Sequence, residues 1–390
     1  MIETSAGVVV AGAGAAGHSA ARTLRQEGYT GPLTVLHHEA HAPYNRTLVN
    51  KAVLQGLLTA AQVALPSLDD LDVHLVRAGV HTIEPDDSVL VLDNGERLPY
   101  SILIAATGST PRPHNAYLGE AARLVHIHTI DDAARIRDWF REDPGATAVT
   151  LLGAGFIGAE TASYLTDAGA AVHLVSRPTV PLAGALGGRI ARRVTELHAE
   201  HVTTHFGRQV RAVSGGADSV TVTLDDGHIL ESDLAVVAHG TVPATAWTTD
   251  TETGIAVDDR LRAVGLRHVY AAGGVAVHTA RTGRSYRIDH WDAASGQGAH
   301  AAKALLHDHA GGEDPGPYVP STGYNFRIYR HAIAAYGVAL PGAVERQHPT
   351  GSADGLLTAF HEPGQQAMTA TAAFDASREL LALRGQLERP

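Results

Sequence analysis

The sequence predicts an α/β protein with two Rossmann-like dinucleotide-binding domains and a small α+β C-terminal domain. Two segments, 7–39 and 146–177, each run through an apolar strand pattern, a GxGxxG turn, an alanine-rich helical pattern and a second strand. A Gly/Pro-rich stretch begins near residue 311, and residues 316–390 then form a mixed unit. One GxGxxG alone is weak evidence, but two in complete strand–turn–helix–strand contexts indicate two nucleotide sites.

The first glycine fingerprint consists of Gly12, Gly14 and Gly17, and it follows the strand pattern VVVA. In such a turn the first glycine permits the tight bend, the second lets a pyrophosphate reach the backbone, and the third lets the helix pack on the strand. The helix that follows points its N-terminus at the phosphates. This turn therefore predicts a site for a dinucleotide.

Gly153, Gly155 and Gly158 form the second fingerprint, and the same three roles are expected of them. Around it, segments 89–109 and 220–240 each predict a hairpin with an NG or DG turn, followed by a buried strand that ends in glycine. The stretch VYAAGGVAVHT at 269–279 predicts another buried strand that runs into Gly-Gly, and ASRELLALRGQL predicts a final helix.

Composition excludes several classes of function. Lys and Arg number 30 against 41 Asp and Glu, a net charge of −11 without a basic block, so neither nucleic acid nor an anionic membrane is an expected partner. The chain has no cysteine, which excludes disulfides, thiolate zinc sites and CxxC redox chemistry. Its 24 histidines are scattered along the chain, and no metal is expected. The N-terminus lacks a basic region before its short apolar run, which favours a cytoplasmic protein.

Several motifs resemble those of the FAD-dependent pyridine-nucleotide oxidoreductases, in the ferredoxin-reductase branch of the putidaredoxin and rubredoxin reductases. The matching stretches are HHEAHAPYNRTLVNKAVL, IAATGSTPRP, GIAVDDRLRA, YRIDHWDAASGQGAHAA and AAFDASRELLALR. The resemblance covers nearly the whole chain and implies a glutathione-reductase-like arrangement. It implies a discontinuous FAD domain at 1–115 and 250–315, an NAD(P)H domain at 116–249 and an interface domain at 316–390.

The resemblance also implies roles for single residues. Glu39 would accept hydrogen bonds from the adenosine ribose, while Arg46 and Lys51 would lie along the pyrophosphate and the flavin. Lys51 and Glu160, the candidate catalytic residues, would pair beside the flavin near the nicotinamide; the alternative is an ion pair that only ties two domains together. The implied cofactor-binding positions are Gly12, Gly14, Ala15, Ala16, Gly17, His38, Glu39, Arg46, Lys51, Val80, Ala106, Thr107, Gly108, Gly153, Gly155, Phe156, Ile157, Gly158, Ser176, Arg177, Gly240, Gly273, Gly274 and Trp291.

Two departures from the family pattern concern the cofactors. Gly274 stands where the family has an aspartate that binds the ribityl chain of FAD, so we expect weaker FAD retention but not its loss. Either the glycine leaves room for a water or a shifted flavin, or the change is neutral drift. Ser176 and Arg177 stand where NADH-specific members carry an acid, and an arginine can hold a 2′-phosphate. NADPH is therefore expected in preference to NADH, unless Arg177 is only a solvated loop residue.

Two further departures concern the surroundings of the flavin. Residues 318–337 lack the family's tryptophan-rich segment, which predicts either a cavity beside the flavin or its partial filling by Tyr324, Phe326 and Tyr329. Asn45 replaces a carboxylate, and with Gly274 this makes the flavin surroundings less negative.

Three functions remain open from the sequence. The first is hydride transfer from nicotinamide to FAD and onward electron transfer to a ferredoxin or another small redox protein. The second is a flavoenzyme that acts on a small-molecule substrate, and the third is a non-catalytic nucleotide-binding protein. A monomer and a homodimer are both compatible with the sequence.

Overall fold

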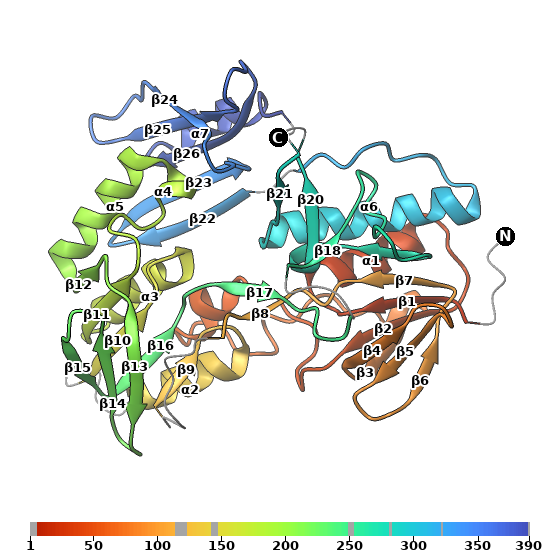
Figure 1. Ribbon diagram of the computed structural model, residues 1–390, viewed down its shortest axis with the longest axis horizontal. Helices are drawn as coiled ribbons and strands as arrows, with labels where there is room; N and C mark the ends of the chain where they lie inside the picture. The colour runs from red at the N-terminus through yellow and green to blue at the C-terminus, as the bar shows by residue number, and fades with distance from the viewer. Residues whose placement is uncertain are drawn as a thin grey trace.

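The computed structural model describes residues 6–113, 123–141, 147–248, 253–280, 283–320 and 323–388 of the 390-residue chain. Two parallel five-stranded sheets lie side by side, and a third, antiparallel sheet lies beside the second of them (Figure 1). Both predicted Rossmann-like units are therefore present, and the predicted fold class is confirmed. Within the described part of the chain, no helix has both the length and the apolar character that a membrane crossing requires.

The first parallel sheet has the order β19-β7-β1-β2-β3. Residues 8–10 are at most 1% exposed, because a parallel strand with helices and sheet on its faces is buried on both sides. Helices α1 (Ala15–Gln26) and α6 (Trp291–Ala310) pack together against this sheet. Its strands are β1 Val8–Ala11, β2 Leu33–His37, β3 His74–Arg77, β7 Ile102–Ala105 and β19 Val269–Ala271.

Shorter elements surround this first sheet. The predicted hairpin at 89–109 forms β5 and β6, which join β4 in an antiparallel sheet on the same hydrophobic core. The strand after the hairpin is β7, as expected. The remaining elements of this region are β4 Val80–Glu84, β5 Val89–Leu92, β6 Arg97–Pro99, β18 Ile255–Ala256, β20 Ala276–Thr279, β21 Ser285–Tyr286, the π-helical turn η1 Val49–Val53, and the 3₁₀ turns η2 Asp69–Leu71 and η3 Gly273–Val275.

The second parallel sheet has the order β12-β11-β10-β16-β9 and carries α2, α3 and α5. The predicted hairpin at 220–240 is β14 and β15, and it leads into the buried strand β16. The elements are β9 Leu124–His126, α2 Ile130–Arg141, β10 Ala148–Leu152, α3 Phe156–Asp167, β11 Ala171–Ser176, α4 Ala183–Leu186, α5 Gly188–His201, β12 Thr203–Phe206, β13 Val210–Gly215, β14 Val220–Leu224, β15 Ile229–Ser232 and β16 Leu234–Val237.

Two short strands connect the parallel sheets. β8 (Ser109–Pro111) pairs antiparallel with β17 (Thr241–Pro243), so both crossings of the chain lie next to each other in the middle of the molecule (Figure 1). The expected boundaries at 115/116 and 249/250 lie outside the described residues, and the division into domains stays a prediction.

The C-terminal unit is an antiparallel sheet with the order β22-β23-β26-β25-β24, followed by α7. Phe326, Ile328 and Tyr329 of its first hairpin share one hydrophobic cluster with Ile190 and Val194 of α5, and β22 packs against α3. This joins the C-terminal unit to the second parallel sheet. Its elements are β22 Gly323–Ile328, β23 His331–Gly337, β24 Val344–His348, β25 Leu356–His361, β26 Met368–Phe374 and α7 Ser377–Arg384.

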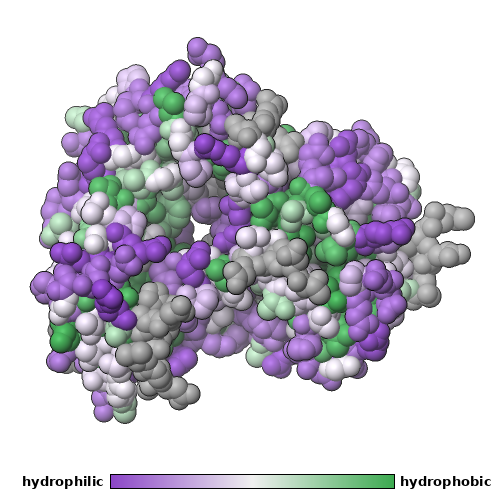
Figure 2. Space-filling view, viewed as in Figure 1, coloured by the Kyte–Doolittle hydropathy of each residue, from purple (hydrophilic) through white to green (hydrophobic). Residues whose placement is uncertain are grey.

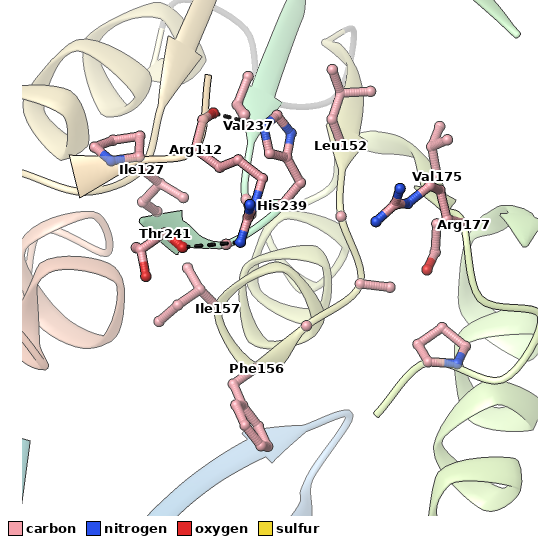
Figure 3. A pocket seen from close by; sticks show the side chains of 18 of the residues that line it. Arg112, Ile127, Leu152, Phe156, Ile157, Val175, Arg177, Val237, His239 and Thr241 are labelled. Carbon is pink, nitrogen blue, oxygen red and sulfur yellow. Dashed lines mark hydrogen bonds between the residues drawn. The ribbon is translucent and has the colours of Figure 1, made fainter. Parts of the chain in front are cut away.

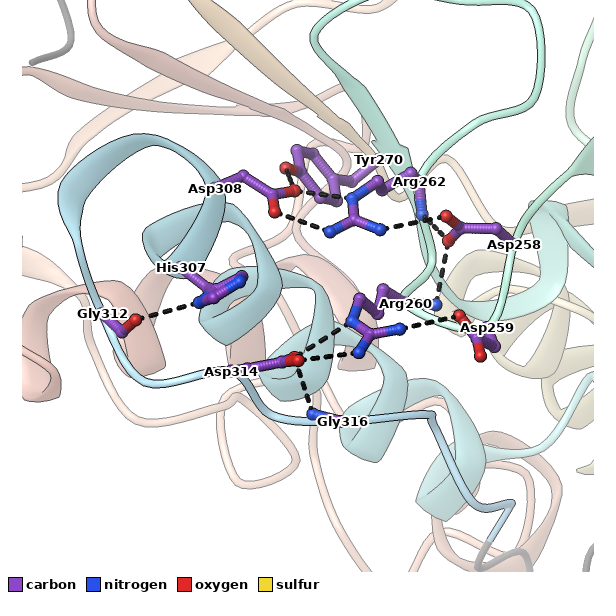
Figure 4. A network of polar contacts seen from close by, with 10 residues as sticks. All are labelled: Asp258, Asp259, Arg260, Arg262, Tyr270, His307, Asp308, Gly312, Asp314 and Gly316. Carbon is purple, nitrogen blue, oxygen red and sulfur yellow. Dashed lines mark hydrogen bonds and ion pairs between the residues drawn. The ribbon is translucent and has the colours of Figure 1, made fainter.

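A polar network fixes the end of α6 to the loop before β19 (Figure 4). Asp308 accepts hydrogen bonds from Arg262 Nε and Nη2, each at 2.6 Å, and from Tyr270 Oη at 2.5 Å. Arg260 makes a second, more exposed pair with Asp314, with Nη2 and Oδ2 at 2.7 Å. The paired charges and the buried Tyr270 ring of β19 hold the end of α6 in place against the sheet.

Candidate functional site

The first glycine turn forms an open cradle at the start of α1. Gly12 has φ +112°, and a Cβ there would lie 2.2 Å from the carbonyl oxygen of Ala106. At Gly14, in contrast, a Cβ would meet no heavy atom within 4 Å, and no side chain caps the helix. The first N–H groups of α1 therefore face open space, as a diphosphate requires. The second glycine turn has the same two features. A Cβ on Gly155 would also meet no heavy atom within 4 Å, and no side chain caps α3.

Glu39 lies after β2 and is held by two neighbours. Its Oε2 accepts a hydrogen bond from Tyr44 Oη at 2.6 Å, and its Oε1 pairs with Arg46 Nη2. Burial opposes ionisation, but the charge of Arg46 and the two hydrogen bonds outweigh it and hold the pKa of Glu39 below its usual range. Arg46 was expected along the pyrophosphate, but it lies beside Glu39, the expected acceptor for the ribose. It also donates a hydrogen bond to His128 O at 3.1 Å. The sequence did not identify Tyr44, although its place in the PYNR stretch was a signal.

The remaining FAD positions gather where β7 and β19 end. Thr107 Oγ1 donates to Ala244 O at 2.8 Å, and Gly108 is open on its Cβ side. Gly273 N donates to Gln297 Oε1 at 2.7 Å, while the fully buried Gln297 Nε2 has no partner among the described residues. His38 follows β2, Val80 begins β4 and Trp291 begins α6. The open cradles and the unpartnered amide are what a bound FAD would complete, so the residues present fit this cofactor.

A cavity of about 800 Å³ lies in front of the second glycine turn (Figure 3). Its size suits a nicotinamide dinucleotide. Arg112, which follows β8, and Arg177, which follows β11, approach it from opposite sides (Figure 3). Of the residues expected at the second nucleotide site, all but Gly158 line this cavity: Gly153, Gly155, Phe156, Ile157, Ser176, Arg177 and Gly240.

The two arginines at the β11 end of this cavity differ in their partners. Arg208 Nε pairs with Asp226 Oδ2 at 2.6 Å, so most of its charge is already balanced. Arg177 is exposed and makes no hydrogen bond or ion pair with any described residue. Arg177 is therefore the free cation at this end of the described cavity.

Three parts of the chain meet at Phe156, the first residue of α3. Its ring lies 4.3 Å from the Tyr324 ring, 5.3 Å from Phe326 and 5.9 Å from His290, measured between centroids. Tyr324 stacks on His290 at 4.7 Å with planes 9° apart. Of the two alternatives for the missing tryptophans, the packing beside Phe156 matches partial filling, since the Tyr324 and Phe326 rings lie against it, while Phe156 and His290 also line the cavity described above. Phe326 and Tyr329 belong to the hydrophobic core. Residues 321 and 322 of the 318–337 segment lie outside the described residues.

Lys51 and Glu160 come close, but the expected direct ion pair is not formed. Lys51 Nζ donates to Asn325 O at 2.6 Å, whereas Glu160 Oε2 accepts from Asn50 Nδ2 at 2.7 Å. Both donors lie on the π-helical turn η1, which points adjacent side chains at different partners. Burial raises the pKa of Glu160, and the nearby charge of Lys51 counteracts this only in part. Asn50, only 3% exposed within an apolar run, is another site residue that sequence reasoning missed.

His290 and Asp289 line the cavity from the α6 side. Burial lowers the pKa of His290 despite the neighbouring carboxylates of Asp289 and Asp292, so the ring is neutral at pH 7. A space-filling view shows the molecule hollowed near its centre, with apolar residues on both walls (Figure 2). In the ribbon view this hollow lies between β17, β22 and the start of α6 (Figure 1).

Comparisons with known proteins agree with this arrangement. Residues 6–298 match the model of a family described as pyridine nucleotide-disulphide oxidoreductase. Apoptosis-inducing factor 3 of Mus musculus is 30% identical over 320 residues, which are 78% of this chain and 51% of that protein. Terpredoxin reductase of a Pseudomonas species is 33% identical over 266 residues, 64% of this chain and 63% of that protein. The chain thus spans about half the length of the first of these relatives.

Solved structures show the same fold. A ferredoxin reductase from Rhodopseudomonas palustris has a TM-score of 0.87 at 23% identity, covering 97% of this chain and 93% of its own. Putidaredoxin reductase in a covalent complex with putidaredoxin has a TM-score of 0.86 at 22% identity, covering 98% and 94%. A water-forming NADH oxidase from Lactobacillus brevis has a TM-score of 0.81 at 19% identity, covering 98% and 91%.

Proposed function

Because this chain belongs to the pyridine nucleotide-disulphide oxidoreductase family, we propose that it is an FAD-dependent NAD(P)H oxidoreductase that delivers electrons to a ferredoxin-type protein. The observation that carries the proposal is the pair of open glycine turns at the starts of α1 and α3. The cavity at the second turn is also lined by Asp289 and His290, which come from the FAD side of the molecule. Two dinucleotides bound in this way would meet between the sheets.

The chain's own residues bind and align the cofactors. When bound, FAD would supply the redox chemistry, namely hydride uptake from the nicotinamide and the release of single electrons. Phe156, His290 and Tyr324 form a wall of packed aromatic rings beside this meeting point, which would limit the access of water to it. No protein acid or base is required for the hydride step, which suits a neutral His290.

The absence of cysteine limits the groups that could carry electrons from FAD to the acceptor. The family is named for disulphide reduction, but a chain with no cysteine has no redox-active dithiol of its own. Electrons would therefore pass to the acceptor without a protein dithiol between it and bound FAD. The relatives include a terpredoxin reductase and a putidaredoxin reductase with putidaredoxin bound, which supports a small iron–sulfur protein as the acceptor.

For the nicotinamide cofactor we propose NADPH. Neighbours with this fold include both an NADH oxidase and an engineered NADPH oxidase, so the fold admits either cofactor. The engineered enzyme carries an aspartate-to-alanine change and, at the next position, an alanine-to-arginine change. Ser176 and Arg177 give this chain a similar pair, with no acid to repel a 2′-phosphate and one unpaired guanidinium to bind it.

The test is an anaerobic titration of the purified protein, first with NADH and then with NADPH, followed by flavin absorbance. A colourless protein that binds no FAD would contradict the proposal and favour a non-catalytic nucleotide-binding protein. Bleaching by NADPH, followed by rapid reduction of at least one member of a ferredoxin panel, is the expected result. Fast bleaching with only sluggish transfer to every ferredoxin, but efficient transfer to oxygen or quinones, would instead favour the small-molecule function.

A further inference from the structure

The strand β22 of the C-terminal sheet lies along α3, the helix that begins at the second glycine turn (Figure 1). Three contacts follow one another in the same order along both elements: Tyr324 with Phe156, Arg327 with Glu160, and Tyr329, directly after the strand, with Ser163. Positions 156, 160 and 163 share one face of a helix, because their spacings are four and three residues. The strand and the turn that follows it therefore have one particular register on α3.

The polar contacts in the middle of β22 do not select this register, because they use main-chain groups that every residue carries. Glu160 Oε1 accepts a hydrogen bond from the main-chain N of Arg327 at 3.2 Å, and Lys51 Nζ donates to the main-chain O of Asn325 at 2.6 Å. A strand that slips by two residues keeps its buried and exposed faces and offers both kinds of group again. A buried side chain with its own binding place is needed to select one register.

Tyr329 has such a binding place. It is only 6% exposed, and its ring stacks on the His201 ring with centroids 4.0 Å and planes 11° apart. Its Oη lies 3.0 Å from His198 Nδ1, and its main-chain N donates to Ser163 Oγ at 2.8 Å. Both histidines belong to α5, whereas Ser163 belongs to α3. Tyr329 is therefore held by two helices of the second parallel sheet at once.

The turn that contains Tyr329 is not favoured by its own sequence. Ile328 pairs with His331, so Tyr329 and Arg330 form a two-residue hairpin turn, with φ values of +44° and +76°. Both values lie in the left-handed region, where such turns favour Asn-Gly because other side chains are strained there. The contacts of Tyr329 with α3 and α5, and not a local preference, therefore hold the turn at this position.

We propose that Tyr329 is a positioning residue for hydride transfer. It fixes the register of β22 on α3, and with it the Tyr324 ring beside Phe156 and the Asn325 carbonyl that binds Lys51. This inference rests on the proposed function, because Phe156 lines the cavity where the two cofactors would meet. The side chains that hold Tyr329 are not among the described residues that line this cavity, so its effect passes through β22.

The test compares two substitutions of Tyr329 by anaerobic stopped-flow reduction of the flavin with NADPH. Tyr329→Asn suits a left-handed turn but removes the ring, whereas Tyr329→Phe keeps the ring and its stack on His201. In Tyr329→Asn the limiting rate of flavin reduction should fall at least about tenfold, because a small displacement of reacting groups slows a reaction strongly. The dissociation constants for FAD and NADPH should stay unchanged. Tyr329→Phe should keep the rate of the unaltered protein.

A second readout needs no nicotinamide. Exchange of the Arg327 amide hydrogen, measured by NMR, reports the register directly, because its acceptor Glu160 lies on α3. This exchange should become faster in Tyr329→Asn and stay unchanged in Tyr329→Phe. If Tyr329→Asn does not fold, Ser163→Ala carries the same test, because it removes the acceptor of Tyr329 N and should change the rate and the exchange in the same directions.

Phe374→Leu is the matched control, since Phe374 is a buried ring of the same sheet, on β26, and its loss lowers stability while β22 keeps its contacts with α3. Its rate and its Arg327 exchange should match those of the unaltered protein. An unchanged rate or an unchanged Arg327 exchange in Tyr329→Asn, or equal losses in Tyr329→Phe, would overturn the inference. An unaltered protein that no nicotinamide reduces would overturn the proposed function and the role in hydride transfer, while the Arg327 exchange would still decide whether Tyr329 fixes the register.

Discussion

The choice between NADPH and NADH depends on one unpaired guanidinium. Arg177→Gln removes the charge at the β11 end of the cavity and keeps a similar length of side chain. A hydrogen bond to a charged group contributes about 1.5–3 kcal/mol, and because Arg177 is exposed the lower end applies. We therefore expect the Michaelis constant for NADPH to rise roughly tenfold, while that for NADH changes less than about twofold.

Stopped-flow reduction of the flavin under anaerobic conditions, at several concentrations of each cofactor, measures both constants. Arg208→Gln is the matched control, because Arg208 lies in the same cavity but already pairs with Asp226 at 2.6 Å. Its effect on NADPH should be clearly smaller. Raising the salt concentration should weaken NADPH binding more than NADH binding in the unaltered protein. Equal losses for both cofactors in Arg177→Gln would refute the reasoning and assign this residue to the shared pyrophosphate or to folding.

Three other predictions follow from single contacts. Gly14→Glu places a carboxylate in the open cradle and should abolish FAD binding without unfolding, whereas Gly155→Glu should abolish flavin reduction by NADPH but leave FAD bound; a folded Gly14→Glu protein with full flavin absorbance would refute the first cradle. Burial lowers the pKa of His198 to about 4 from an unfolded value near 6.5, so the unfolded state binds the extra proton and stability falls as pH drops through this window. Urea unfolding measures the free energy of unfolding at pH 7 and at pH 4. Between these two pH values the His198→Gln variant should lose roughly 3 kcal/mol less of this free energy than the unaltered protein, and an identical loss would contradict this. Asp308→Asn should lower the free energy of unfolding by about 1.5–3 kcal/mol, because Arg262 and Tyr270 lose a charged acceptor; FAD affinity measured alongside should not change.

The fold followed from the sequence because its signals are local. A strand, a glycine turn and a helix within 30 residues fix one another, and the NG and DG turns fix their own hairpins, so both parallel sheets could be predicted. The arrangement of side chains in the site could not be, because it depends on contacts between distant segments. Asn50, next to Lys51 in sequence, reaches Glu160 only because η1 is a π-helical turn.

The same limit applies to the two expectations about space, which were room at position 274 and either a cavity or its partial filling at the missing tryptophans. A glycine in place of an aspartate, or a missing tryptophan, indicates lost volume only if nothing else moves in. At position 274 the incoming group is Asp289, which is 15 residues later in sequence and follows another strand, β21. No periodicity or spacing reports such a contact.

The meeting of three segments at Phe156 gives the C-terminal unit a part in the site. Phe156 starts α3 of the second sheet, His290 immediately precedes α6 on the first, and Tyr324 belongs to β22 of the C-terminal sheet. Tyr324 Oη also donates to Ala185 O at 3.3 Å, and Lys51 Nζ reaches Asn325 O on the same strand. A change in the position of β22 would therefore move the wall of the cavity and the partner of Lys51 together. The C-terminal sheet is thus a structural component of the place where the two cofactors would meet, and a variant of β22 should alter hydride transfer without touching either glycine turn.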